Sequence, residues 1–213
     1  MKIIKPYYEI LDDLNQETML KKIEYAGRKC YKSEDRIQEG SADKFIANII
    51  KRGHGSVLEH YSFSVLFVCD RGVSHELVRH RLASYSQEST RYVNYSKDKY
   101  GREITVIEPS FFEKDTTNLS PYLMWKFACE SAEAYYMGLL DSGCKPEEAR
   151  SVLPHSVKTE IVVSANIREW RHILSLRTPH AAHPQIRELM IPLAKELAEK
   201  CPVLFGDILK EEV

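Results

Sequence analysis

The sequence RHRLASYSQESTRY, residues 79–92, gathers more cationic, hydroxyl and amide groups than any other stretch of this 213-residue chain. Its arginines are permanently charged and offer planar groups with several donors, and its hydroxyls also suit phosphate oxygens. A helix end with solvated charges is the alternative interpretation. The density of hydroxyls and the histidine between two arginines argue against it, so the segment predicts a binding site for a dianionic ligand.

On both sides of this segment, hydrophobic periodicity predicts short strands and helices. Strands are predicted at residues 2–10, 62–69, 104–108 and 158–165. Helices are predicted at residues 16–30, 41–52, 73–83, 121–143, 147–153 and 167–176, and from residue 184 onward. Ser41, Ser120 and Asn166 are expected N-caps, because short polar side chains accept hydrogen bonds from the first helical turn. Residues 84–96 lack apolar periodicity and are expected to form a loop.

These elements predict one compact domain over residues 1–213, because no repeat, low-complexity segment or linker divides the chain. The expected class is α/β of the α+β type, with a central, mostly antiparallel sheet flanked by helices. The chain contains neither GxGxxG nor a GxxxxGKS or GxxxxGKT motif. Any nucleotide would therefore be held without a Rossmann fold or a P-loop.

The helix predicted at 73–83 leads directly into the basic segment. Glu76, Arg79 and His80 fall at positions i, i+3 and i+4, so they are expected to share one helical face. The core-facing residues of this helix are expected to be Leu77, Val78 and Leu82.

A second basic surface is predicted on the helix at 167–176. Arg168 and His172 lie at i and i+4, opposite the apolar positions, and Arg177 follows just past them. An exposed, salt-bridging helix face is the alternative.

The junction Gly53-His54-Gly55-Ser56 could also border a site. Glycines on both sides of His54 let the backbone turn and allow a ligand to approach closely, so His54, Ser56 and Glu59 could line it. A plain turn explains the same spacing equally well.

Composition limits the remaining function classes. A net charge of -1 gives no support to nucleic-acid binding, and no apolar stretch approaches the ~20 residues of a membrane span. Five widely spaced cysteines without a CxxC pair are expected to be free thiols in a reducing, cytoplasmic compartment. His180 and His183 could suggest a metal pair, but no Asp or Cys accompanies them, and no metal is expected.

The motif RHR, seven residues, then Ser, at 79–89, resembles the signature of the flavin-dependent thymidylate synthases. Further similarity lies in Gly53–Ser56 with Glu59-His60, in Glu148–Arg150 with Leu153-Pro154, and in Ser164–Asn166 leading to Leu176-Arg177. The resemblance spans roughly residues 50–205 and so covers most of the chain.

The resemblance implies a homotetramer of α/β subunits whose active sites are shared between neighbouring chains and hold FAD. The implied reaction is the methylation of dUMP to dTMP. In it, 5,10-methylenetetrahydrofolate gives the one-carbon unit, and FAD reduced by NADPH gives the hydride. No cysteine nucleophile is expected, because none of the five cysteines lies in a segment that the resemblance places at the site.

The resemblance also implies roles for individual residues. The residues implied to contact or border FAD are His54, Ser56, Arg79, His80, Arg81, Gln87, Asn166, Ile167, Arg168, His172 and His183. The residues implied to bind dUMP are Glu76, Leu77, Val78, Arg79, Gln87, Glu88, Ser89, Thr90, Arg91, Arg150 and Arg177. Arg177 is expected to be catalytic, because a guanidinium beside the uracil can stabilise negative charge on the ring as its C5 carbon becomes nucleophilic.

Three alternatives compete with this interpretation. Ser89 could be a nucleophile, but no general base is assured beside it, and a serine among arginines more often binds phosphate. A single-strand RNA or DNA module could stack bases on Tyr85, Tyr92 and Tyr95, but the net charge opposes it. A phosphohydrolase could use His80, but Arg81 stands where a glycine would be expected.

Overall fold

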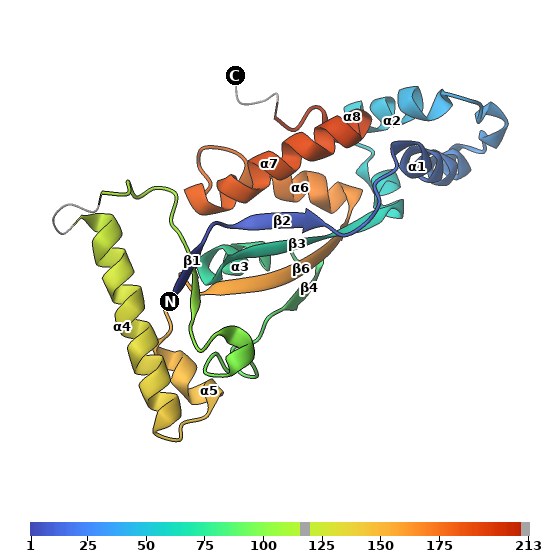
Figure 1. Ribbon diagram of the computed structural model, residues 1–213. Helices are drawn as coiled ribbons and strands as arrows, with labels where there is room; N and C mark the ends of the chain where they lie inside the picture. Colours follow the sequence, from blue (N-terminus) through green and yellow to red (C-terminus); the bar gives the residue numbers. More distant parts are fainter. Residues whose placement is uncertain (116–119, 210–213) are drawn as a thin grey trace. The chain divides into compact units, whose positions relative to one another are not determined.

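A computed structural model describes residues 1–115 and 120–209, which fall into two compact units (Figure 1). The first unit comprises residues 1–7, 67–79 and 86–162. The second comprises residues 8–66, 80–85 and those from 163 onward. The chain thus crosses between the units several times, and twice within the basic segment 79–92.

A four-stranded antiparallel sheet has the strand order β2-β3-β6-β4. Its strands are β2 (Tyr7–Ile10), β3 (Ser62–Asp70), β4 (Ser84–Gln87) and β6 (Lys158–Asn166). β3, β4 and β6 each contribute residues to both units. The strands predicted at 62–69 and 158–165 and the antiparallel sheet are confirmed.

The prediction of a single strand at 2–10 is wrong, because this segment forms two. β1 (Lys2–Ile4) pairs in parallel with β5 (Thr105–Ile107), with Lys2 opposite Thr105. The strand stops at Lys5-Pro6, since proline has no N–H group to continue a ladder. β2 then pairs with β3 in the other sheet.

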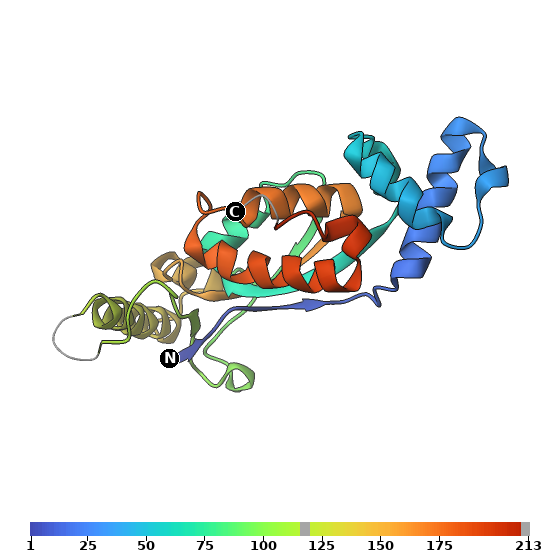
Figure 2. The ribbon, with the colours of Figure 1, turned by 90° about the horizontal axis from the view of Figure 1, so that it is seen from above.

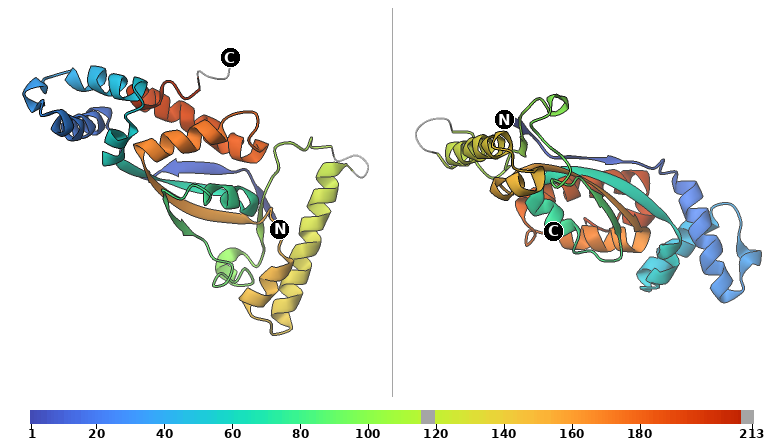
Figure 3. Two further views of the ribbon diagram at one scale, coloured as in Figure 1. Left: turned by 180° about the vertical axis from the view of Figure 1, so that it is seen from behind. Right: turned by 90° about the horizontal axis from the view of Figure 1, so that it is seen from below.

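The first unit also contains α3 (Arg71–Leu77), α4 (Pro121–Asp141), α5 (Pro146–Ala149) and 3-10 turns at Asp98–Tyr100 and Arg150–Val152. α4 begins as predicted, since Ser120 Oγ accepts a hydrogen bond from the backbone N–H of Leu123 and proline opens the first turn. Its Cys129 and Tyr136 are buried in a core with Ile104 and Val106. Figure 3 shows α5 beside the C-terminal end of α4. Along the described ranges, no helix combines the length and apolar character needed to cross a membrane.

The second unit contains α1 (Gln16–Tyr31), α2 (Ser41–Lys51), α6 (Ile167–Arg177), α7 (Pro184–Lys200), α8 (Pro202–Phe205) and 3-10 turns at Glu34–Arg36 and Gly55–His60. α1 packs against α2, and α6 lies beside α7 (Figure 2). The N-cap predicted at Ser41 is wrong by one residue, because Gly40 caps α2 with a φ of 71°. Ser41 instead donates a hydrogen bond to the Glu24 carboxylate of α1 at 2.8 Å.

The core of the second unit is built on three aromatic rings. Trp170 stacks on Phe63 with ring centroids 5.1 Å apart, and Phe205 meets Phe63 edge-on at 6.4 Å. Trp170 Nε1 also donates to the Phe63 carbonyl at 3.1 Å. As predicted, Asn166 caps α6 by accepting from the backbone N–H of Glu169 at 2.9 Å. These contacts fix α6 on β3.

The helix predicted at 73–83 ends at Leu77, so Glu76, Arg79 and His80 do not share a helical face. Only Leu77 of the three expected core residues is buried, since Val78 is 38% exposed and Leu82 is 77% exposed. The apolar repeat therefore stops after the first turns. It no longer favours a helix beyond that point.

The loop predicted at 84–96 is also partly wrong, because residues 84–87 form β4. Ser84 and Ser86 are exposed while Tyr85 and Gln87 are half-buried, which is the alternation of a strand. Its inward side chains form hydrogen bonds, since Gln87 Nε2 donates to Ser74 Oγ at 2.9 Å and to Thr159 Oγ1 at 3.1 Å. This polar strand lacks the β-branched and apolar residues that usually indicate one.

Two helical glycines give a paired test of packing. A Cβ on Gly27 of α1 would lie 2.7 Å from Phe45 Cε1 and 2.8 Å from Val57 Cγ1, whereas a Cβ on Gly138 of α4 would meet nothing within 4 Å. We expect Gly27→Ala to lower the melting temperature, because displacing these side chains costs about 1–3 kcal/mol. Gly138→Ala is expected to raise it, because alanine favours a helix by about 1 kcal/mol.

Differential scanning calorimetry of both variants beside the wild type measures the two shifts. A rise in the melting temperature of Gly27→Ala would mean that Phe45 moves without cost, and would contradict this account of α1.

Candidate functional site

The residues expected to bind dUMP and those expected to bind FAD lie mostly in different units. Most of the residues implied to bind dUMP lie in the first unit, with Arg177 the exception. Most of those implied to contact FAD lie in the second, with Arg79 and Gln87 the exceptions. Each unit therefore brings together its own set of functional groups.

In the first unit, a basic pocket of about 340 Å³ joins Thr90 and Arg150 with Arg71, His75 and His155. β3 passes directly into α3, where Asp70 caps the helix by accepting from the N–H of Val73 at 2.8 Å. This turn brings Arg71 and His75 to the pocket. Two guanidinium groups, two imidazoles and a hydroxyl suit an oxyanion such as phosphate.

Arg71, His75 and His155 were missed by sequence reasoning. The rings of His75 and His155 meet edge-on at 5.5 Å, and Arg71 N–H donates to the His155 carbonyl at 2.9 Å. The available signal was Asp70-Arg71 at the end of a buried strand, a position that often carries functional groups.

The run 87–91 is held mainly by its own unit. Glu88 accepts a hydrogen bond from Tyr95 Oη at 2.7 Å and pairs with Lys158 at 2.9 Å, so its carboxylate already has protein partners. Ser89 Oγ accepts from the backbone N–H of Arg91 at 3.3 Å, and Arg91 pairs with Glu147 at 2.9 Å.

The remaining members of the substrate set surround α3. Glu76 is half-buried and Leu77 is buried, so a contact from Leu77 to a ligand would come from its backbone. Val78 and Arg79 follow the helix and are exposed.

In the second unit, His80 is the centre of a buried polar group. Arg177 Nε donates to His80 Nε2 at 3.0 Å, and His80 Nδ1 lies 3.9 Å from a carboxylate oxygen of Glu169. The side chains of His80 and Glu169 are only 4% and 6% exposed. Since Nε2 accepts from an arginine, the ring proton lies on Nδ1 and faces Glu169.

Burial and the neighbouring charges of Arg177 and His172 lower the pKa of His80 to about 4. The imidazole is therefore neutral near pH 7 and can serve Arg177 as an acceptor. The Tyr85 hydroxyl donates to the His80 carbonyl at 2.7 Å, and burial together with Glu169 raises the pKa of Tyr85 to about 12. Sequence reasoning did not identify Glu169 or Tyr85 as members of this group.

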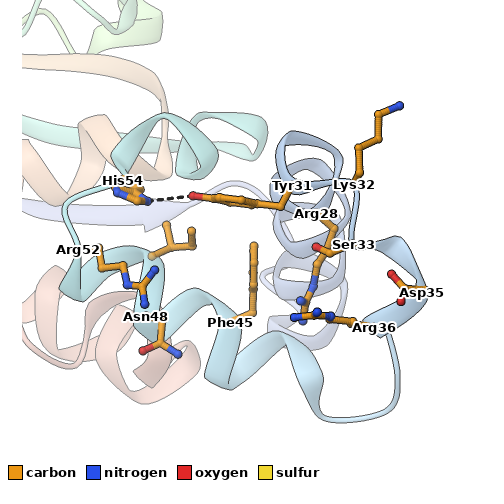
Figure 4. A pocket seen from close by; sticks show the side chains of 11 residues that line it. Arg28, Tyr31, Lys32, Ser33, Asp35, Arg36, Phe45, Asn48, Arg52 and His54 are labelled. Atoms are coloured by element: carbon orange, nitrogen blue, oxygen red, sulfur yellow. Dashed lines mark hydrogen bonds between the residues drawn. The ribbon is translucent and has the colours of Figure 1, made fainter.

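The 53–56 junction lies close to Arg168. A Cβ on Gly55 would lie 3.0 Å from Arg168 Nε, so the missing side chain lets the guanidinium cross the backbone closely. Arg168 pairs with Glu59 at 2.6 Å. His54 and Ser56 are exposed, and Figure 4 shows His54 Nδ1 hydrogen-bonded to the Tyr31 hydroxyl at 3.2 Å.

The other residues expected at FAD lie around α6. Asn166 caps the helix, and Ile167 is buried and donates its N–H to the Tyr61 carbonyl at 3.0 Å. His172 and His183 are exposed, and the His172 ring meets His80 edge-on at 6.0 Å. Arg81 is exposed beyond the buried His80.

Taken together, Arg81, Arg168, His54, Ser56 and His172 form a set of exposed donors on the second unit. Guanidinium and hydroxyl groups suit a diphosphate. The residues present thus fit a flavin nucleotide.

Comparison with known proteins gives consistent matches. Residues 13–203 match the family described as thymidylate synthase complementing protein. The chain is 35% identical to the flavin-dependent thymidylate synthase of Pyrococcus furiosus over 179 residues, which cover 84% of this chain and 71% of that protein. It is 34% identical to that of Geobacter sulfurreducens over 189 residues, which cover 85% and 78% of the two chains.

A solved structure shares this fold. The UMP/dUMP methylase PolB from Streptomyces cacaoi, bound with 5-Br dUMP, matches with a TM-score of 0.78 and 24% identity. The match covers 100% of this chain and 98% of PolB.

The lowered pKa of His80 predicts a pH dependence of stability. Below pH 6.5, His80 is protonated in the unfolded chain, whereas in the folded protein it stays neutral down to about pH 4. The free energy of unfolding therefore falls as the pH decreases through this window. Between pH 7 and pH 5 the loss is about 2 kcal/mol. His80→Gln keeps an acceptor for Arg177 and removes the titration, so its melting temperature should fall less between these pH values. Equal falls for both proteins would contradict a neutral, buried His80.

Proposed function

Because this chain belongs to the flavin-dependent thymidylate synthase family, we propose that it makes dTMP by reductive methylation of dUMP. The methyl carbon comes from 5,10-methylenetetrahydrofolate. Bound FAD, reduced by NADPH, supplies the hydride that completes the methyl group. The residues of the chain bind and orient the reactants and stabilise charge.

The orientation of Arg177 is the observation that carries this proposal. Its Nε is held by the neutral His80, whose other nitrogen faces Glu169, so the plane of the guanidinium is fixed. A cation fixed beside the uracil would stabilise the negative charge that develops as C5 becomes nucleophilic. No thiolate has to add to the ring.

The cysteines support a route without a thiol nucleophile. Burial raises the pKa of the thiols of Cys69, Cys129 and Cys201, which makes them poor nucleophiles near neutral pH. Cys30 and Cys144 lie outside the segments that hold the site residues.

The basic pocket of the first unit is the proposed site for the dUMP phosphate. Arg150 and Thr90 would bind its oxygens, and Arg71 would add a charge that sequence reasoning did not include. Glu76, Val78, Arg79 and the run 87–91 would hold the nucleoside. The exposed donors of the second unit would hold FAD.

Further proposals concern assembly and location. β3, β4 and β6 each run through both units, which supports a single catalytic domain over residues 1–213. A homotetramer with active sites shared between subunits and a cytoplasmic location remain predictions.

The proposed function is tested by anaerobic turnover. The purified protein should be yellow and should bleach on addition of NADPH. With dUMP and 5,10-methylenetetrahydrofolate it should then form dTMP, detected by mass spectrometry. A colourless protein that cannot be reconstituted with FAD would refute the proposal.

Arg177→Ala and Arg177→Lys are the matched variants for this assay. Arg177→Ala should lose at least about 100-fold in turnover, in line with the loss of one charge-stabilising group, while keeping FAD. Arg177→Lys keeps the charge but not the planar guanidinium, so its turnover should lie between those of the wild type and Arg177→Ala. Unchanged turnover in Arg177→Ala would remove its proposed role.

Ser89 is expected to bind rather than to attack. Its Oγ accepts from the Arg91 N–H at 3.3 Å, as expected for a side chain that shapes the run 87–91. We expect Ser89→Ala to retain turnover with a raised KM for dUMP, measured by steady-state kinetics. Loss of all turnover with intact dUMP affinity would instead indicate a nucleophile.

A further inference from the structure

A cavity between α1 and α2, within the second unit, has no role in the proposed function so far. Its volume of about 390 Å³ is within the range of about 300–1,000 Å³ that is usual for small-molecule sites. Figure 4 shows side chains from both helices and from the segment that joins them around this space. His54, which is expected to border the flavin, forms part of its wall.

The cavity is basic. Four cations line it, namely Arg28, Lys32, Arg36 and Arg52, against the single carboxylate of Asp35. The charge of Arg28 is already balanced by the buried Glu24, whose Oε1 accepts hydrogen bonds from Arg28 Nη2 at 2.8 Å and from Arg28 Nε at 3.1 Å. Neither Arg36 nor Arg52 forms an ion pair with another residue of ranges 1–115 and 120–209. An oxyanion would supply the missing partner.

The cavity also presents aromatic surfaces. The Phe45 ring lies under Arg28, with the guanidinium carbon 4.4 Å from the ring centroid. The Tyr31 ring is 54% exposed, yet its hydroxyl is held by His54 Nδ1 at 3.2 Å, so it is both open and oriented. An oriented aromatic ring beside guanidinium groups suits a planar ring that carries an oxyanion.

We propose that this cavity binds the part of a cosubstrate in which a planar aromatic group is joined to a carboxylate- or phosphate-bearing group. The inference rests on the proposed function for the identity of the two candidate sources. One is the p-aminobenzoyl-glutamate portion of the folate, and the other is the 2′-phosphorylated adenosine of NADPH. Each belongs to a molecule whose reactive end must reach the flavin, and His54 links the cavity to the expected flavin site.

Titration calorimetry on the FAD-loaded protein tests the proposal with two probes, N-(p-aminobenzoyl)-L-glutamate and adenosine 2′,5′-bisphosphate. Arg36→Ala and Arg52→Ala should each weaken binding of one probe by about tenfold, as expected for the loss of one charge-assisted hydrogen bond. Lys51→Ala is the control, because Lys51 is the last residue of α2, directly before Arg52, and is exposed but does not line the cavity. FAD content should be unchanged in all three variants.

The probes separate the two sources. Weaker binding of the aminobenzoyl-glutamate, with a raised KM for the folate, assigns the cavity to the folate. Weaker binding of the bisphosphate, with a reduced preference for NADPH over NADH in flavin reduction, assigns it to the nucleotide.

The proposal is overturned if the wild type binds neither probe, if the arginine variants bind both probes as the wild type does, or if Lys51→Ala loses as much affinity as they do. These are binding measurements, so they are independent of turnover. If the wild type forms dTMP but the arginine variants bind the probes as the wild type does, only this inference is refuted. If the arginine variants bind a probe more weakly but the wild type forms no dTMP, only the proposed reaction is refuted.

Discussion

The stacking of Trp170 on Phe63 holds α6 against β3, and the direction of every basic side chain on this helix depends on it. The indole also donates to the Phe63 carbonyl, so the helix can neither rotate nor slide without losing a buried hydrogen bond. With the apolar face fixed, Arg168 and His172 must point to solvent and Arg177 must leave the last turn toward His80. A hydrophobic contact thus sets the geometry of the polar site.

The buried polar group of the second unit depends on which partner carries charge. A protonated His80 would place an imidazolium against the Arg177 guanidinium in a region of low dielectric, where like charges repel strongly. Keeping the imidazole neutral removes this repulsion and supplies an acceptor. Glu169 then stands close to the ring proton and offsets the arginine charge. The guanidinium of Arg177 is therefore held in a fixed orientation by a neutral partner and a nearby carboxylate.

Elements with a local start signal could be predicted from the sequence, and those defined by long-range contacts could not. Ser120-Pro121 and Asn166 with Glu169 correctly identified the first residues of α4 and α6. β4 was missed because it pairs with β6, and the hydrogen bond from Gln87 to Thr159 joins residues distant in the chain. The basic segments of the candidate site were visible as residue types, but Arg71, His75, Glu169 and Tyr85 became members only through folding.

The six residues 80–85 belong to the second unit, while residues 79 and 86 on either side belong to the first. Both ends of this short stretch are therefore tied, and its second end is already part of β4. One inserted residue would turn Tyr85 and Gln87 to the opposite face of the sheet and break their hydrogen bonds. Natural variation in this part of the chain should therefore proceed by substitution, with its length held constant.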